Sequence, residues 1–82
     1  MQPVEQMDVL DAARKLMDIA DVRVTRQGIT PEDVVLNGGT LRSVLSLARS
    51  ECRKPGGRYS RTYAERLADH IEAKMRAADS AA

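Results

Sequence analysis

The sequence predicts a mainly α fold, with one small four-helix domain spanning residues 1–82. A chain of 82 residues, 43% hydrophobic and 30% charged, has the size and composition of one globular domain. Apolar residues recur three and four positions apart through most of it, which is the spacing of one helix face. Pro, Thr, Asn and Gly stand between these segments, where helices begin and end.

The first helix is predicted at residues 3–20. Pro3 suits a first-turn position, where a backbone amide has no partner within the helix. The apolar stripe that follows consists of Val9, Ala13, Leu16 and Ala20. Residues 22–25, "VRVT", then alternate apolar and polar side chains. This pattern is too short to distinguish a strand from an extended linker, so a short strand at 22–25 stays open.

The segment "TPEDVVLNGG", residues 30–39, predicts a short second helix. Thr30 is its expected N-cap and Pro31 its first residue. Two acidic residues follow, close to the positive end of the helix dipole. The residues "NGG" at 37–39 predict its end, because Asn and Gly tolerate the left-handed backbone found there.

The third helix is predicted at residues 41–54, with Thr40 as its N-cap. Its apolar stripe comprises Leu41, Val44, Leu45, Ala48 and Cys52, with Leu47 beside it. The residues "KPGG" break this helix. A fourth helix then starts with a capping box formed by Thr62 and Glu65. It is expected to run to about residue 78, with residues 79–82 frayed.

Positive charge is concentrated in one stretch, although the net charge of the chain is only +1. Residues 42–61 contain six basic residues and a single acidic one, Glu51. Residues 1–37 instead contain seven acidic and four basic residues. Such a separation bears on partners and not on fold. It predicts one basic surface on an otherwise balanced domain.

The polar side of the third helix carries the most specific part of this charge. Arg42, Ser46, Arg49 and Arg53 are spaced i, i+4, i+7 and i+11, which places them on one helix face. Arg presents a planar donor fork that matches phosphate or guanine edges, and Ser hydrogen-bonds to either. The loop beyond the helix is expected to follow a neighbouring phosphate strand. The predicted DNA-contacting residues are Arg42, Ser43, Ser46, Arg49, Arg53, Lys54, Arg58, Tyr59 and Arg61.

Residues 30–49 resemble a helix-turn-helix motif. Val34, Gly38, Val44 and Leu47 stand at the spacing that this family uses for its packing residues and its turn. The position after Gly38, usually apolar in the family, is Gly39 here. The resemblance implies that the second helix of the pair enters the major groove of DNA.

A second resemblance is to ribbon-helix-helix proteins, through "VRVT" and the later segment "GTLRSVLSLAR". It implies that Arg23, Thr25 and Gln27 contact bases, and that Thr40 and Ser43 contact phosphate. It ranks second because the helix after "VRVT" is only about seven residues long and another helix precedes the strand.

The sequence gives little support for catalysis. Cys52 and His70 are the only residues of their kinds, and together they cannot supply the ligands of a usual zinc site. No phosphate-binding loop or nucleophile elbow is present. We therefore expect no enzyme activity, no metal, no cofactor and no small-molecule substrate.

The sequence also lacks a membrane or secretion signal. No apolar run reaches the roughly 18–20 residues that span a bilayer, and the first residues lack a basic start followed by an apolar run. One cysteine allows no intramolecular disulfide. These features predict a cytoplasmic protein without membrane contact.

The resulting hypothesis is a small DNA-binding protein whose partner is double-stranded DNA, acting as a dimeric transcriptional or plasmid/phage maintenance regulator. Symmetric pairing would place two arginine faces one DNA turn apart. The alternative is a helical protein–protein adaptor or subunit with no nucleic-acid role.

Overall fold

In the computed structural model, the chain is almost entirely helical over the residues that it describes, 3–21 and 28–81. The elements are the 3-10 helix η1 (Val4–Gln6) and the α-helices α1 (Val9–Ile19), α3 (Pro31–Leu36), α4 (Gly38–Cys52) and α5 (Arg61–Ala81). The predicted mainly α fold is thus confirmed. The strand left open at 22–25 falls outside the described residues.

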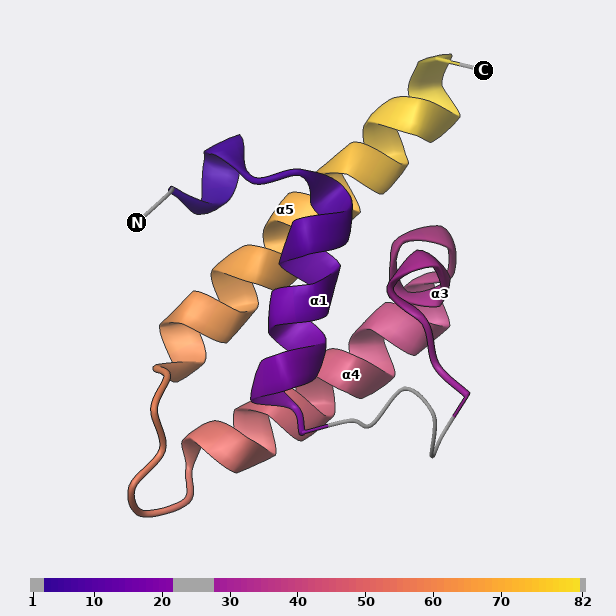
Figure 1. Ribbon diagram of the computed structural model, residues 1–82. Helices are drawn as coiled ribbons and strands as arrows, with labels where there is room; N and C mark the ends of the chain where they lie inside the picture. Colours follow the sequence, from indigo (N-terminus) through magenta and orange to yellow (C-terminus); the bar gives the residue numbers. More distant parts are fainter. Residues whose placement is uncertain (1–2, 22–27, 82) are drawn as a thin grey trace.

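Helix α1 lies in the middle of the bundle and packs against α3, α4 and α5 (Figure 1). Helices α4 and α5 also pack against each other, and residues 53–60 join them at one end of the bundle. The largest fully buried side chains lie where the apolar stripes meet: Leu16, Leu41, Leu67, Ile71, Val34 and Val44. Within the described ranges no polar or charged residue is buried. Every charged side chain described is therefore at the surface.

The predicted helix over 3–20 is wrong in its first part. Helix α1 starts only at Val9, because the Asp8 carboxylate accepts a hydrogen bond from the Leu10 amide at 3.3 Å and caps the helix. Asp favours this N-cap position over a helix interior. The preceding η1 is a separate piece that buries Val4 in the core and pairs Glu5 with Arg66 of α5 at 2.8 Å.

The boundary between α3 and α4 also differs from the prediction. Asn37 is the only residue between the two helices, and it serves as C-cap of α3 and N-cap of α4. Its Oδ1 accepts hydrogen bonds from the amides of Gly39, at 2.9 Å, and Thr40, at 3.1 Å. Gly38 and Gly39 thus begin α4, and Thr40 is not its cap. A Cβ at position 39 would lie 3.1 Å from Asn37 Oδ1, so glycine there leaves room for the cap.

Helix α5 starts two residues earlier than predicted, at Arg61. The Ser60 hydroxyl accepts a hydrogen bond from the Tyr63 amide at 3.1 Å, so the capping box of Thr62 and Glu65 does not form. Helix α5 extends to Ala81, beyond the end predicted near residue 78. No Gly or Pro follows residue 78 to stop it. Helix α4 ends at Cys52, two residues earlier than predicted.

Candidate nucleic-acid interface

The outer side of α4 carries Arg42, Ser46, Arg49 and Arg53, which we call the α4 basic face. Arg42, Ser46 and Arg53 are exposed, and Arg49 is half-buried toward α5. Neither Arg42 nor Arg53 has an ion-pair partner among the described residues. At 1.5 Å per residue, the two are about 16 Å apart along the helix axis. The face therefore presents two unpaired guanidinium groups, with a serine hydroxyl between them.

Arg49 is tied to α5 through a shared carboxylate. Glu65 Oε1 accepts hydrogen bonds from Arg49 Nε at 3.2 Å and from Arg61 Nε at 2.9 Å. The three side chains remain 39%, 54% and 36% exposed for Arg49, Arg61 and Glu65. The hydrogen bond from Arg61, together with the charge of Arg49, lowers the pKa of Glu65. Two of the predicted DNA contacts are thus paired within the chain.

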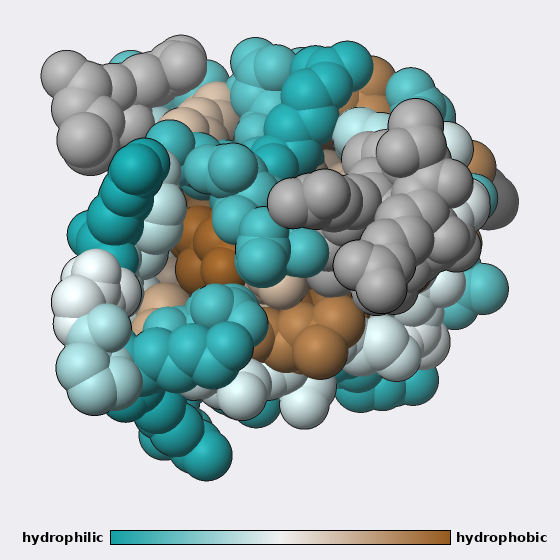
Figure 2. Space-filling view, turned by 60° about the horizontal axis from the view of Figure 1, so that its bottom comes forward, coloured by the Kyte–Doolittle hydropathy of each residue, from teal (hydrophilic) through white to brown (hydrophobic). Residues whose placement is uncertain are grey.

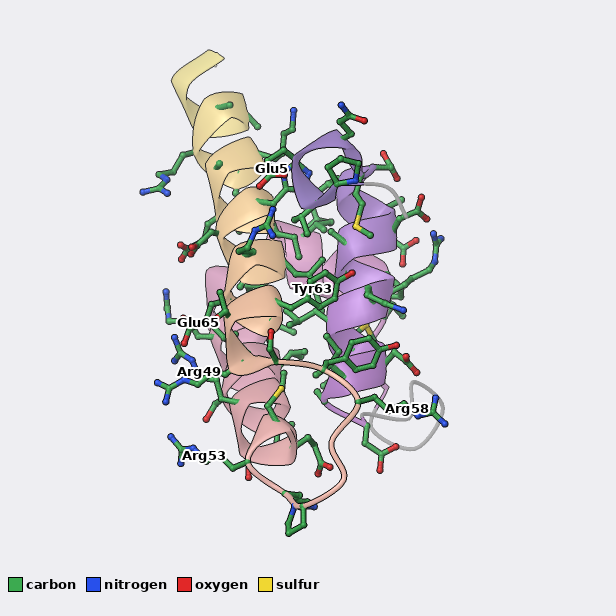
Figure 3. All side chains as sticks on the ribbon, turned by 90° about the vertical axis from the view of Figure 1, so that its left-hand side faces the viewer. Glu5, Arg49, Arg53, Arg58, Tyr63 and Glu65 are labelled. Carbon is green, nitrogen blue, oxygen red and sulfur yellow. The ribbon has the colours of Figure 1, made fainter. Side chains whose placement is uncertain are left out.

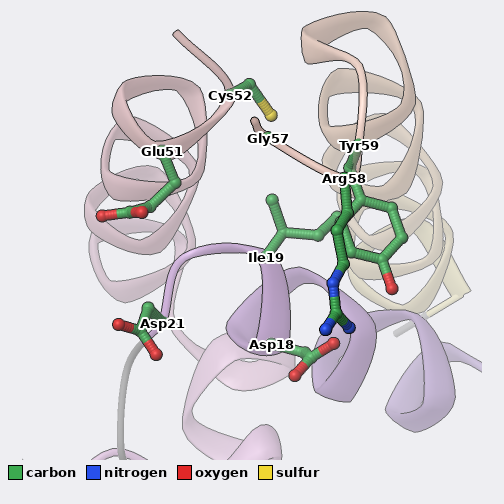
Figure 4. A pocket seen from close by; sticks show the side chains of 8 residues that line it. All are labelled: Asp18, Ile19, Asp21, Glu51, Cys52, Gly57, Arg58 and Tyr59. Atoms are coloured by element: carbon green, nitrogen blue, oxygen red, sulfur yellow. The ribbon is translucent and has the colours of Figure 1, made fainter. Parts of the chain in front are cut away.

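The predicted contacts in the loop after α4 point in different directions. Lys54 pairs with Glu51 at 2.8 Å, which raises the pKa of Lys54. Arg58 projects on the opposite side of the molecule from Arg49 and Arg53 (Figure 3), and its guanidinium points toward Asp18 (Figure 4). The loop therefore does not extend the α4 basic face.

Tyr59 fastens this loop to α1. Its hydroxyl accepts a hydrogen bond from Lys15 Nζ at 2.9 Å, and the ammonium lies 4.8 Å from the ring centroid. The ring stacks on Tyr63, with 5.8 Å between centroids. The hydrogen bond to Tyr59 raises the pKa of Lys15. Half-buried and in contact with Lys15 and Tyr63, Tyr59 packs the loop against α1 and α5 in the free protein.

A pocket of about 210 Å³ opens where this loop meets the carboxyl ends of α1 and α4. Figure 4 shows the carboxylates of Asp18, Asp21 and Glu51 around it, together with Arg58. Ile19, Cys52, Gly57 and Tyr59 complete its lining. Cys52 is half-buried here. The pocket lies apart from the α4 basic face.

The residues of the helix-turn-helix pattern divide into two groups. Val34 and Val44 are completely buried, while Leu47 is 43% exposed. The side of α4 turned to the core is that of Leu41, Val44 and Ala48, which leaves Leu47 at its border. Gly38 lies within α4 and not in a turn.

The ribbon-helix-helix positions are only partly described. Arg23, Thr25 and Gln27 fall outside the described residues. Thr40 is half-buried in the first turn of α4, and Ser43, also a predicted DNA contact, is exposed beside the α4 basic face.

The described ranges contain no group of three His, Cys, Asp or Glu side chains arranged to hold a metal ion. His70 Nε2 lies 2.9 Å from the Met7 carbonyl oxygen and ties α5 to the N-terminal segment. None of the helices in this part of the chain has the length and apolar character to cross a membrane.

No protein-family model, curated protein or solved structure matches this chain. Glu65 was not predicted as part of this site. The sequence pattern placed it in a capping box, whereas its carboxylate accepts hydrogen bonds from Arg49 and Arg61. Its i,i+4 spacing from Arg61 is a signal that could have found one of its two partners.

Proposed function

We propose that this chain binds double-stranded DNA through the α4 basic face, as a dimeric transcriptional or plasmid/phage maintenance regulator. The observation that carries the proposal is the pair of exposed guanidinium groups, Arg42 and Arg53, with no acidic partner in the described ranges. Arg14, by contrast, pairs with Asp11 at 3.0 Å. The guanidinium donors of Arg42 and Arg53 are available to a partner outside the chain.

The shape of α4 supports the same proposal. It is a 15-residue helix, and the major groove of B-DNA is wide enough to admit one α-helix. Its buried and exposed sides are distinct, so the basic face can approach DNA while Leu41 and Val44 stay in the core. Phosphate contacts by Arg42 and Arg53 would orient the helix, and Ser46 lies between them to meet a base edge or phosphate.

The proposal is tested by an electrophoretic mobility-shift assay with random-sequence duplex DNA at about 50 and 200 mM salt. The Arg42→Ala/Arg53→Ala variant should lose most of the affinity of the wild type. Its matched control is Arg14→Ala/Arg58→Ala, which removes the same charge away from the α4 basic face. Equal losses of affinity in both variants would mean that net charge alone, and not the α4 basic face, causes the effect. If the wild type binds no DNA at the lower salt, the proposal is wrong.

A protein–protein adaptor or subunit is the second candidate. It is favoured by two apolar side chains in solvent, Leu36 at 80% exposed and Leu47 at 43% exposed. Apolar residues also show among the hydrophilic ones on the face in Figure 2. If DNA is not retained at low salt, these leucines become the first positions to substitute in a search for a protein partner.

A further inference from the structure

The most specific arrangement of charge in the described chain is the convergence of two arginines on one oxygen atom. Arg49 comes from the fourth turn of α4 and Arg61 is the first residue of α5, and both donate through Nε to Glu65 Oε1. The terminal amino groups of the two guanidinium groups make no hydrogen bond to other described residues. Two cationic donor groups from different helices are therefore gathered around one anionic acceptor.

A DNA phosphate has the same requirements as this carboxylate. Each is a singly charged anion with two oxygens that only accept hydrogen bonds, and guanidinium groups bind both in the same geometry. On the strength of the proposed function, we infer that Arg49 and Arg61 form a phosphate-binding site occupied in the free protein by Glu65. In the bound state, a backbone phosphate of DNA takes the place of the Glu65 carboxylate.

The exchange is energetically accessible because the three side chains are partly exposed. Exposed ion pairs contribute little to stability, so releasing Glu65 to water costs little. Glu65 is a carboxylate at neutral pH, and its partners lower its pKa further, so it competes with phosphate as an anion. A phosphate that replaces it gains in addition from the counterions released by DNA.

The position of the pair extends the α4 basic face. Arg53 follows Arg49 by one helical turn on the same side of α4, and Arg49, Arg53 and Glu65 lie along one side of the molecule (Figure 3). Release of Glu65 would add two guanidinium groups beside Arg42 and Arg53. Glu65 thus acts as an internal competitor that the phosphate backbone must displace.

The test compares Glu65→Gln with Asp69→Asn. Asp69 is exposed on α5, one turn beyond Glu65, and has no ion-pair partner in the described part of the chain. Both substitutions remove one negative charge, and only the first removes the competitor. Binding of a short random-sequence duplex is measured by fluorescence anisotropy, with circular dichroism to verify the fold. Glu65→Gln should tighten binding about fivefold, the strength of an ordinary surface ion pair, and clearly more than Asp69→Asn.

A third variant measures the contact itself. Arg61→Ala should weaken binding, because Arg49 alone is left to hold the phosphate, and should reduce the slope of log affinity against log salt, because the site loses one positive charge. An unchanged slope means that Arg61 stays with the protein and overturns the inference.

The outcomes separate this inference from the proposed function. If Glu65→Gln binds no better than Asp69→Asn while Arg42→Ala/Arg53→Ala still loses affinity, DNA binding stands and the exchange at Glu65 is wrong. Weaker binding by Glu65→Gln has the same consequence, since Glu65 would then hold the arginines in position. No binding by wild type or Glu65→Gln overturns both proposals.

Discussion

Replacing Asn37 by alanine should destabilise the domain, because it removes the side chain that caps the start of α4. Asn37 Oδ1 accepts from two amides at the start of α4, those of Gly39 and Thr40, at 2.9 and 3.1 Å. Loss of an N-cap side chain costs about 1 kcal/mol, within a range of about 0.5–2. Because Oδ1 serves two amides, we expect Asn37→Ala in the upper half of that range. For a domain of this size, each kcal/mol lowers the melting temperature by about 4–8 °C.

The assay is urea unfolding followed by far-UV circular dichroism, with Asn37→Asp and Thr40→Ala as matched variants. Asn37→Asp keeps an acceptor oxygen beside a helix N-terminus and should stay close to wild type. Thr40→Ala should cost little, since Thr40 caps nothing and alanine favours the helix interior. Asn37→Ala as stable as wild type, or Thr40→Ala as unstable as Asn37→Ala, would refute the assignment of Asn37 as the cap.

Three further predictions concern the loop and the surface carboxylates. Tyr59→Phe should lower the free energy of unfolding by about 1 kcal/mol, because Lys15 loses its acceptor while the ring keeps its stacking; equal stability in urea would contradict this. Gly56→Ala should cost about 1–2 kcal/mol in the same assay, because Gly56 has φ +81° in the left-handed region, whereas a neutral result would mean that the loop rearranges. Hydrogen bonds from Arg66 and Arg61 lower the pKa values of Glu5 and Glu65 below 4.5. Their stabilising effect is therefore present above that value and lost as pH falls through the lowered values. As the pH is lowered past about 5, the melting temperature should decrease, and it should decrease less steeply in Glu5→Gln/Glu65→Gln. Parallel pH profiles of wild type and variant would exclude the ion pairs of Glu5 and Glu65 as the cause.

Helix content was predictable from this sequence because apolar periodicity is a local signal. The stripe Leu41, Val44 and Ala48 is buried as its spacing requires. The cap of α3 was predictable as well, since Thr30 Oγ1 accepts from the Asp33 amide at 3.2 Å and the Asp33 carboxylate accepts from the Thr30 amide at 2.9 Å. Every partner in that box lies within one turn, so no tertiary contact decides it.

A helix boundary was not predictable where the same residues suit two different capping roles. Asn37 suits the end of one helix and the start of the next, and the glycines after it suit either role. Glu65 could cap Thr62 or pair with arginine. Because Ser60 caps α5, Thr62 lies within the helix, and the Glu65 carboxylate accepts from the two guanidinium groups instead. One of them, Arg49, reaches Glu65 only because α4 packs on α5, a contact that no local spacing encodes.

The candidate site shows the same limit in its charges. Six basic residues in 42–61 predict one strongly basic surface, yet Arg49, Lys54 and Arg61 pair with acids inside the chain, and Arg58 points to the opposite side. Seen from beyond a Debye length of about 10 Å, an arginine paired with a glutamate contributes little attraction. Within contact distance the pairs can exchange partners, since exposed pairs are weak. Under the proposed function, the chain would therefore be drawn only weakly toward DNA at long range and would engage its full set of arginines only when α4 lies against the phosphate backbone.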